Sequence, residues 1–328
     1  MILPIEFRPL TWTSLCQVGS KPLVPTIVEQ LLAGSTLALA QVISQVENES
    51  PQAPCLLDAL YPYSGTAYRL GITGPPGAGK STLVDQLTRL YRKASLKVGI
   101  MGVDPTSPFT GGALLGDRLR MSSHQLDEGV FIRSMATRGE TGGLAARTQE
   151  VGDVLDAAGF DVLIFETVGV GQVELDVVET VDTTVVVLVP ESGDDIQLMK
   201  AGILEIADVL VINKSDREGA DRLRRLLEQM LALKENDSPW KTPVCQTSAT
   251  QGDGIEELGE LLGSHQAYLE KSGRQEHKHR QRARQKVEML VAREVLAGFW
   301  NQDRRDALDT GLDTMPPYKL ARAILDMS

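Results

Sequence analysis

The sequence feature that most constrains the fold is an octapeptide of the form G-x-x-x-x-G-K-S, which spans Gly74 to Ser81. It stands between the strand-like run of residues 68–73 and the helical run of residues 82–87. Glycines in such a loop let successive backbone N–H groups turn inward around phosphate oxygens, and the following helix points its positive dipole end at them. An ordinary glycine-rich turn would not require the whole pattern between a strand and a helix. The octapeptide therefore predicts a nucleoside triphosphate site.

Two side chains of this loop have specific predicted roles. Lys80 would reach the β- and γ-phosphates, and the Ser81 hydroxyl would bind Mg²⁺. The predicted phosphate-binding residues are Gly74, Pro75, Pro76, Gly77, Ala78, Gly79, Lys80, Ser81 and Thr82.

A second motif indicates the base. Asn213, Lys214 and Asp216 form an N-K-x-D sequence directly after the apolar run of residues 209–212. The Asp216 carboxylate can accept two hydrogen bonds from guanine, whereas adenine offers no such donor pair. A buried carboxylate left without these partners is costly, so the wrong base should be rejected by several kcal/mol. The motif is short, but its place well behind a phosphate-binding loop makes guanine recognition a strong prediction.

A short segment near residue 249 is a further candidate contact for the nucleotide. Ser248, Ala249 and Thr250 follow another strand-like run and fit the backbone loop that closes over guanine. An ordinary turn at the end of a strand is the alternative. With this segment included, the predicted ligands are GTP and GDP.

The apolar runs of the central region predict an α/β fold with a mostly parallel sheet. Short all-apolar strands alternate with helical stretches, which is typical of strands covered on both faces. Ligands of such sheets bind at the carboxyl ends of the strands, where all of these motifs fall. The predicted strands are residues 70–73, 98–103, 162–166, 184–189, 209–212 and 243–246.

Three regions are predicted along the chain: a helical N-terminal extension over residues 1–63, a P-loop domain over 64–268 and a helical C-terminal arm over 269–328. Apolar spacing in the first region predicts helices over residues 24–33 and from about residue 35 to 47. In the last region a basic segment, residues 271–286, precedes an apolar stripe. We expect this stripe to pack on a partner subunit or on the core. The stripe consists of Val287, Leu290, Val291, Val295 and Phe299.

Composition excludes several classes of protein. The chain has 328 residues, which is room for one large α/β domain plus helical extensions. A net charge of −11 argues against a general nucleic-acid binder. No apolar run approaches the ~20 residues of a membrane span, and the start of the chain lacks the pattern of a secretory signal. Cys16, Cys55 and Cys245 form no C-x-x-C metal motif. We therefore expect a cytoplasmic protein without nucleic-acid or membrane partners.

Carboxylates after two other predicted strands are candidate Mg²⁺ ligands. Asp104 and Glu166 each end an apolar run, and Mg²⁺ at phosphates typically uses one or two carboxylates and keeps waters. Ras-like GTPases have D-x-x-G where this chain has E-T-V-G; the acid holds Mg²⁺ through water and the glycine, here Gly169, senses the γ-phosphate. Asp117 is either a further ligand or the N-cap of a helix.

Two more polar residues are candidates for the hydrolysis step. An acidic, glycine-containing loop follows another apolar strand and ends in Lys200, which could neutralise transition-state charge on the phosphates. A surface lysine on the following helix fits the residues equally well. Gln172 is a candidate for orienting water, but it lies farther along the chain than the glutamine of Ras-like GTPases.

Taken together, these motifs resemble the MeaB-type GTPase chaperones of adenosylcobalamin-dependent acyl-CoA mutases, the ArgK/MMAA family once labelled as arginine/ornithine transport kinases. The resemblance covers nearly the whole chain, and the combination of ETVGVGQ with DPTSPFTGG is highly specific. The segments that carry it are GPPGAGKST, VDPTSPFTGGALLGDRLRM, FDVLIFETVGVGQVE, ESGDDIQLMKAGILEIAD and NKSD.

The resemblance implies a SIMIBI-class G domain with slow GTP hydrolysis that the mutase accelerates. It also implies a homodimer built by the C-terminal arm, and switch segments that gate cobalamin loading and rescue. Ser81, Asp104, Asp117 and Glu166 would surround Mg²⁺. The loop of residues 191–200 would be an extra switch, with Lys200 entering the site when the mutase is bound. Lys80, Glu166 and Lys200 form the implied catalytic set.

Three other functions remain open from the sequence. A metal-insertion GTPase would need a Cys/His cluster near the switch segments, and the three cysteines do not supply one. A kinase for a transport protein would need an acceptor site, which nothing in the chain suggests. A pure assembly factor would retain the nucleotide site with vestigial hydrolysis.

Overall fold

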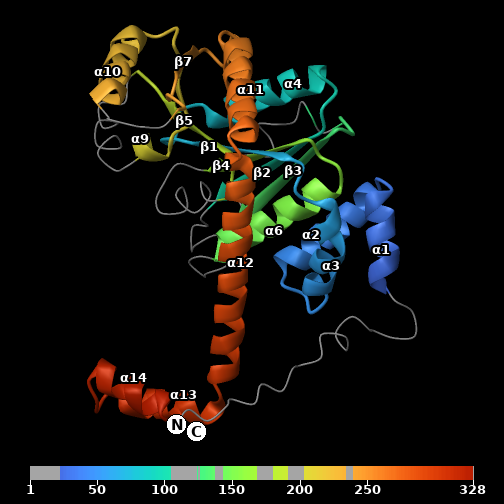
Figure 1. Cartoon of the computed structure of the whole chain (residues 1–328), viewed down its shortest axis with the longest axis vertical. Helices are drawn as coiled ribbons and strands as arrows, with labels where there is room; N and C mark the ends of the chain where they lie inside the picture. The colour runs from blue at the N-terminus through green and yellow to red at the C-terminus, as the bar shows by residue number, and fades with distance from the viewer. Residues whose placement is uncertain are drawn as a thin grey trace. The chain divides into compact units, whose positions relative to one another are not determined.

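The computed structural model describes residues 23–104, 124, 126–136, 143–167, 180–190, 203–233 and 239–327. Within these ranges lies a seven-stranded sheet in the order β3-β2-β4-β1-β5-β6-β7, with every neighbouring pair parallel. Figure 1 shows the strands side by side. The prediction of an α/β fold with a parallel sheet is confirmed. The strands are β1 (Tyr68–Thr73), β2 (Val98–Asp104), β3 (Val130–Ala136), β4 (Val162–Thr167), β5 (Thr183–Leu188), β6 (Val209–Asn213) and β7 (Val244–Thr247).

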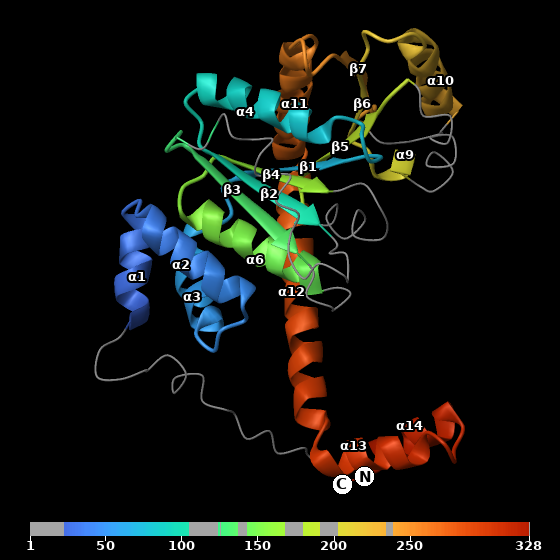
Figure 2. The ribbon, with the colours of Figure 1, turned by 180° about the vertical axis from the view of Figure 1, so that it is seen from behind.

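Helices cover the sheet on both faces, which explains its all-apolar strands. Seen from behind in Figure 2, α4 and α11 lie on one side of the sheet and α6 on the other. Along β4, Ile164 packs in the cluster shared with α4 and α11, and the next residue, Phe165, packs in the cluster shared with α6. The helices over the sheet are α4 (Lys80–Lys93), α6 (Gly143–Ala157), α9 (Ile203–Ile206), α10 (Ala220–Leu233) and α11 (Ile255–Lys271).

One strand, β3 at the edge of the sheet, was missing from the sequence prediction. Its neighbour is β2, with Val98 opposite Val130 at the start of the pairing. The strand carries Arg133 and Ser134 in its middle and most of its residues are half-buried, so it lacks the continuous apolar run of the central strands. The other six strands form where the sequence predicts them, within two residues at each end.

The N-terminal helices are α1 (Leu23–Leu32), α2 (Thr36–Glu47) and α3 (Ala53–Leu60). Gly34 has a φ of 90° and separates the first two, and the Ser35 side chain caps α2 by accepting a hydrogen bond from the backbone N–H of Ala38 at 3.3 Å. Both helices predicted for this region are therefore confirmed. All three helices share a hydrophobic cluster with α6 and the sheet.

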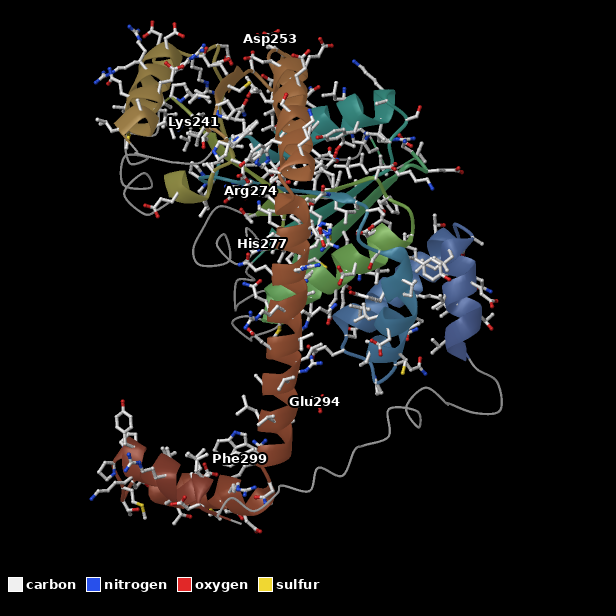
Figure 3. The ribbon with its side chains drawn as sticks, viewed as in Figure 1. Lys241, Asp253, Arg274, His277, Glu294 and Phe299 are labelled. Atoms are coloured by element: carbon white, nitrogen blue, oxygen red, sulfur yellow. The ribbon has the colours of Figure 1, made fainter. Side chains whose placement is uncertain are left out.

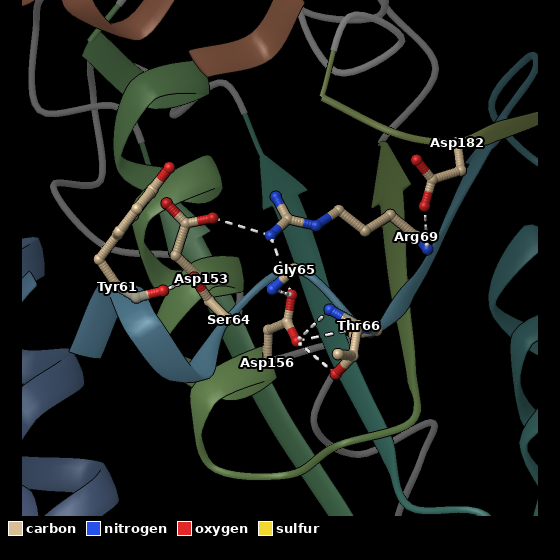
Figure 4. Close-up of polar contacts among 9 residues, drawn as sticks. Tyr61, Ser64, Gly65, Thr66, Arg69, Asp153, Asp156 and Asp182 are labelled. Atoms are coloured by element: carbon tan, nitrogen blue, oxygen red, sulfur yellow. Dashed lines mark hydrogen bonds and ion pairs between the residues drawn. The ribbon is translucent and has the colours of Figure 1, made fainter. Parts of the chain in front are cut away.

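A buried polar network holds the amino ends of the central strands together (Figure 4). The Asp156 carboxylate of α6 accepts hydrogen bonds from the backbone N–H groups of Gly65, Thr66 and Ala67 at 2.7–3.1 Å. These three residues lead into β1. On β1 itself, the Arg69 guanidinium pairs with Asp153 at 2.7 Å. Burial alone would lower the pKa of Arg69, but the nearby carboxylates of Asp153 and Asp156 outweigh burial and raise this pKa. This network fixes the path from the N-terminal helices into the sheet.

The chain divides into two compact units, residues 1–276 and 277–328. Helix α12 (Arg274–Phe299) begins and ends at residues that are both labelled in Figure 3. In the second unit, α14 (Pro317–Leu325) packs on α13 (Gln302–Gly311) and buries Leu320 and Ile324. No helix in the described part of the chain has the length and apolar character needed to cross a membrane.

Candidate nucleotide-binding site

The predicted phosphate-binding loop lies between the carboxyl end of β1 and the start of α4. Gly74, Gly77 and Gly79 have φ values of 138°, 77° and 87°, a region that side-chain-bearing residues rarely adopt. Space is also restricted, because a Cβ on Gly74 would lie 2.0 Å from the carbonyl oxygen of Val187. The loop conformation therefore depends on glycine both for its backbone angles and for close contact with β5.

Lys80 is folded into this loop. Its side chain is buried, and the Nζ donates hydrogen bonds to the carbonyl oxygens of Gly74 at 2.7 Å and Pro75 at 3.0 Å. Both acceptors are neutral, whereas a phosphate oxygen is anionic and attracts the ammonium group more strongly. A bound phosphate can therefore replace these carbonyls as the partner of the ammonium group.

The structure brings two of the predicted metal ligands together. Ser81, in the first turn of α4, donates a hydrogen bond from its Oγ to the Oε1 of Glu166 at 2.6 Å. Glu166 lies near the end of β4 and is 9 % exposed. A hydroxyl and a carboxylate at the start of a phosphate-binding helix are hard oxygen ligands of the kind that Mg²⁺ prefers, so these residues fit the predicted metal.

The other predicted metal and switch residues are less fully described. Asp104 ends β2, beside β4, where Val103 is paired with Thr167, so its backbone lies at the same edge of the sheet as Glu166. Asp117, Gly169, Gln172 and Lys200 lie outside the described residues.

Asn213 joins the three sequence motifs. It is buried at the end of β6, and its Nδ2 donates to the carbonyl of Ala78 in the phosphate loop at 2.7 Å. Its Oδ1 accepts from the backbone N–H of Ala249 at 3.1 Å and from the Thr247 hydroxyl at 3.2 Å. One side chain thus connects the phosphate loop, the N-K-S-D motif and the segment of residues 248–250, which were predicted separately.

The carboxylate predicted to read guanine is bonded to Ser248. Asp216 is exposed in the structure and not buried as the sequence argument assumes, and its Oδ1 accepts a hydrogen bond from the Ser248 hydroxyl at 2.8 Å. Ser248 and Ala249 are buried, whereas Thr250 is exposed. Lys214, between Asn213 and Asp216, has a φ of 57°, an uncommon value for a residue with a side chain that is often found in functional loops.

Sequence reasoning missed two residues at this edge. The hydroxyl of Thr167, the last residue of β4, donates to the hydroxyl of Thr73, the last residue of β1, at 3.0 Å. Both are buried. Each adjoins a predicted motif, since Thr73 precedes the phosphate loop and Thr167 follows Glu166, but no sequence signal indicates that the two meet.

Among the described residues, no group of three or more His, Cys, Asp or Glu side chains could hold a metal ion. This part of the chain therefore supplies nothing like the Cys/His cluster that a metal-insertion GTPase would need.

The fold and the site define the class: a P-loop nucleotide-binding protein that carries a guanine-recognition motif. A family model described as methylmalonyl Co-A mutase-associated GTPase MeaB matches residues 39–304. The chain belongs to this family and is a GTPase.

Individual relatives agree with this assignment. The chain is 50 % identical over 279 residues to a GTPase-named protein of Pyrococcus abyssi, covering 84 % of this chain and 86 % of that protein. It is 37 % identical over 285 residues to the GTPase ArgK of Escherichia coli, with 84 % and 86 % covered. Among solved structures, a LAO/AO transport system kinase superimposes with a TM-score of 0.71 at 29 % identity, covering 94 % of this chain and 99 % of that one.

Proposed function

We propose that the protein hydrolyses GTP to GDP and phosphate at the carboxyl edge of its sheet, and that this cycle gates adenosylcobalamin loading and rescue in a B12-dependent acyl-CoA mutase. The observation that carries the proposal is the Asn213 side chain, which hydrogen-bonds to the phosphate loop at Ala78 and to the segment of residues 248–250 at Ala249. The family description, which names methylmalonyl-CoA mutase, supports the choice of partner.

The nucleotide would be held at both of its ends. Lys80 and the backbone N–H groups of residues 74–82 would bind the phosphates, with Lys80 exchanging its two carbonyl acceptors for phosphate oxygens. Asp216, oriented by Ser248, would accept the N1–H and exocyclic amine of guanine. Because adenine cannot donate this pair, ATP should be rejected.

Ser81 and Glu166 would hold Mg²⁺ with Asp104 and Asp117. When bound, Mg²⁺ neutralises charge on the β- and γ-phosphates. The Ser81–Glu166 hydrogen bond keeps both oxygens adjacent and ready for the metal. We assign Gly169 to sensing the γ-phosphate and Lys200 to stabilising negative charge in the transition state.

We also propose that the C-terminal arm of residues 269–328 forms a homodimer. Val287, Val291 and Val295 recur at helical spacing on α12, and their side chains are 58 %, 56 % and 51 % exposed. Apolar residues aligned on an exposed helix face favour burial against another helix.

The GTPase rate of the purified protein, alone and with each cobalamin-dependent mutase of its own source, tests the proposal. One mutase should accelerate hydrolysis strongly. The acceleration should be lost in Lys200→Ala but kept in Lys97→Ala, which removes an exposed lysine at the opposite edge of the sheet. Labelled γ-phosphate should be released as inorganic phosphate and should not appear on protein.

If no mutase accelerates hydrolysis while GTP is still preferred over ATP, the GTPase assignment stands and the chaperone role is wrong. Metal-binding stoichiometry would then test the metal-insertion alternative.

A further inference from the structure

The hydroxyl pair of Thr73 and Thr167 is unusual for its surroundings. The two side chains are 3 % and 2 % exposed, at the ends of two strands in which every residue is buried. Valine has the same shape and would suit a buried strand as well. A buried hydroxyl that is left unpaired is destabilising, and here each hydroxyl pairs with the other.

The Thr73–Thr167 hydrogen bond and the Ser81–Glu166 hydrogen bond hold the end of β4 on its two opposite faces. Successive side chains of a strand point to opposite faces, and Ile164 and Phe165 pack in separate clusters. By this alternation Glu166 lies on the face of α4, where it reaches Ser81. Thr167 lies on the face of α6, where it reaches Thr73.

Thr73 and Ser81, the partners of Thr167 and Glu166, lie on either side of the phosphate loop. Thr73 is the last residue before the loop, and Ser81 is the second residue of the helix after it. Any sliding of β4 relative to β1 would therefore move the Glu166 carboxylate away from Ser81. The hydroxyl bridge opposes this movement because it joins the last residues of the two strands, one position beyond the Ile72–Glu166 pair that ends their register.

We propose that Thr167 is a positioning residue for the metal: its hydrogen bond to Thr73 sets the end of β4 so that the Glu166 carboxylate stands at the Ser81 hydroxyl. This inference rests on the proposed GTP·Mg²⁺ site. It assigns the hydroxyl pair a role in divalent-cation affinity that is separate from its role in stability.

The experiment compares Thr73→Val, Thr167→Val, the double variant and Thr167→Ser. Each valine substitution alone leaves one buried hydroxyl unpaired, so each should lower the melting temperature. The double variant replaces both hydroxyls by groups of the same shape and should recover most of the stability. Binding of Mn²⁺ to the GDP complex, measured by electron paramagnetic resonance, should weaken about fivefold in all three valine variants and not in Thr167→Ser.

Thr183→Val is the matched control. The Thr183 hydroxyl is also buried and accepts from the Tyr68 hydroxyl at 2.6 Å, but at the amino end of the sheet. Its loss should lower stability and leave Mn²⁺ affinity unchanged.

A double valine variant that binds Mn²⁺ like the wild type would overturn the inference. So would Thr183→Val weakening Mn²⁺ binding as much as Thr167→Val. If the wild-type GDP complex binds no Mn²⁺ and its GTP hydrolysis is independent of Mg²⁺, the proposed metal site itself is wrong and the inference falls with it.

Discussion

The two edges of the sheet both bury polar side chains, but they differ in the partners of those side chains. At the amino edge, Asp156 accepts backbone N–H groups and Arg69 pairs with Asp153, so every partner belongs to the fold. At the carboxyl edge, Lys80 donates to loop carbonyls and Ser81 donates to Glu166. In the proposed function, phosphate oxygens replace the carbonyls as partners of Lys80, and a divalent cation binds at Ser81 and Glu166.

The difference shows how one physical rule produces two outcomes. A buried polar group needs a hydrogen-bond partner at either edge. Where no ligand competes for the partner, the group stabilises the fold. Where the partner can be replaced by a better one, the same requirement makes a binding site that remains ordered without its ligand.

The largest expected effect breaks the amino edge. Asp156→Ala leaves the buried N–H groups of residues 65–67 without their acceptor and removes one carboxylate near Arg69. We expect a loss of about 3–5 kcal/mol in the free energy of unfolding, measured with urea. Glu228→Ala, which breaks an exposed ion pair with Arg224, should change it by less than about 0.5 kcal/mol. Equal effects in the two variants would contradict the fixed role of this network.

The next effect breaks the carboxyl edge. Lys80→Ala removes the cation that would stabilise the phosphates, and we expect kcat for GTP hydrolysis to fall about 1,000-fold. Lys93→Ala, at the other end of the same helix and exposed, should retain the wild-type kcat. Because the partners of Lys80 are proposed to be exchangeable, Lys80→Ala should change the free energy of unfolding far less than Asp156→Ala does. A comparable loss would make Lys80 a structural residue.

A third substitution tests the N-K-S-D motif. In Asp216→Asn, one carboxylate oxygen becomes an amide donor that clashes with the guanine donors, so GTP affinity should fall about 100-fold. Xanthosine triphosphate, which presents a carbonyl in place of the amine, should bind Asp216→Asn more tightly than it binds the wild type. Glu218→Ala, an exposed acid in the same loop, is the control. Unchanged GTP affinity in Asp216→Asn would rule out the assigned role.

The smallest effect concerns Cys245 on β7, three residues before Ser248. Burial raises the pKa of the Cys245 thiol to about 12. The folded state therefore keeps this proton at pH values where the unfolded thiol loses it, above about 8.5. Because the raised folded pKa favours the protonated form, stability should fall as pH rises from 9 towards 12, and less steeply in Cys245→Ala. Denaturation midpoints across this range measure the difference, and identical slopes would contradict the burial of the thiol.

Most of the fold could be predicted from sequence because its signals are local. Six strands and the helices α1 and α2 follow from apolar runs, helical spacing and the cap at Ser35. The edge strand β3 could not be predicted in the same way. Its half-buried surface permits Arg133 and Ser134, and its pairing with β2 is the main sign that it is a strand.

The motifs and their place at the carboxyl ends of the strands were predicted, but the contacts that join them were not. The phosphate loop and the N-K-S-D motif are each recognisable in a few residues. The bond from Asn213 to Ala78 spans 135 residues, and the bond from Thr167 to Thr73 spans 94. Such contacts depend on which strands become neighbours in the sheet, which local patterns do not determine.

The claim that hydrogen-bond partners at the carboxyl edge are exchangeable is tested most directly by a crystal structure with Mg²⁺ and a non-hydrolysable GTP analogue. We predict that the Lys80 Nζ leaves the carbonyls of Gly74 and Pro75 for phosphate oxygens, and that a cation binds the Ser81 hydroxyl beside Glu166. The Asp156 contacts should be unchanged. An analogue bound with Lys80 still on its two carbonyls, or with no cation at the Ser81 hydroxyl, would contradict the account.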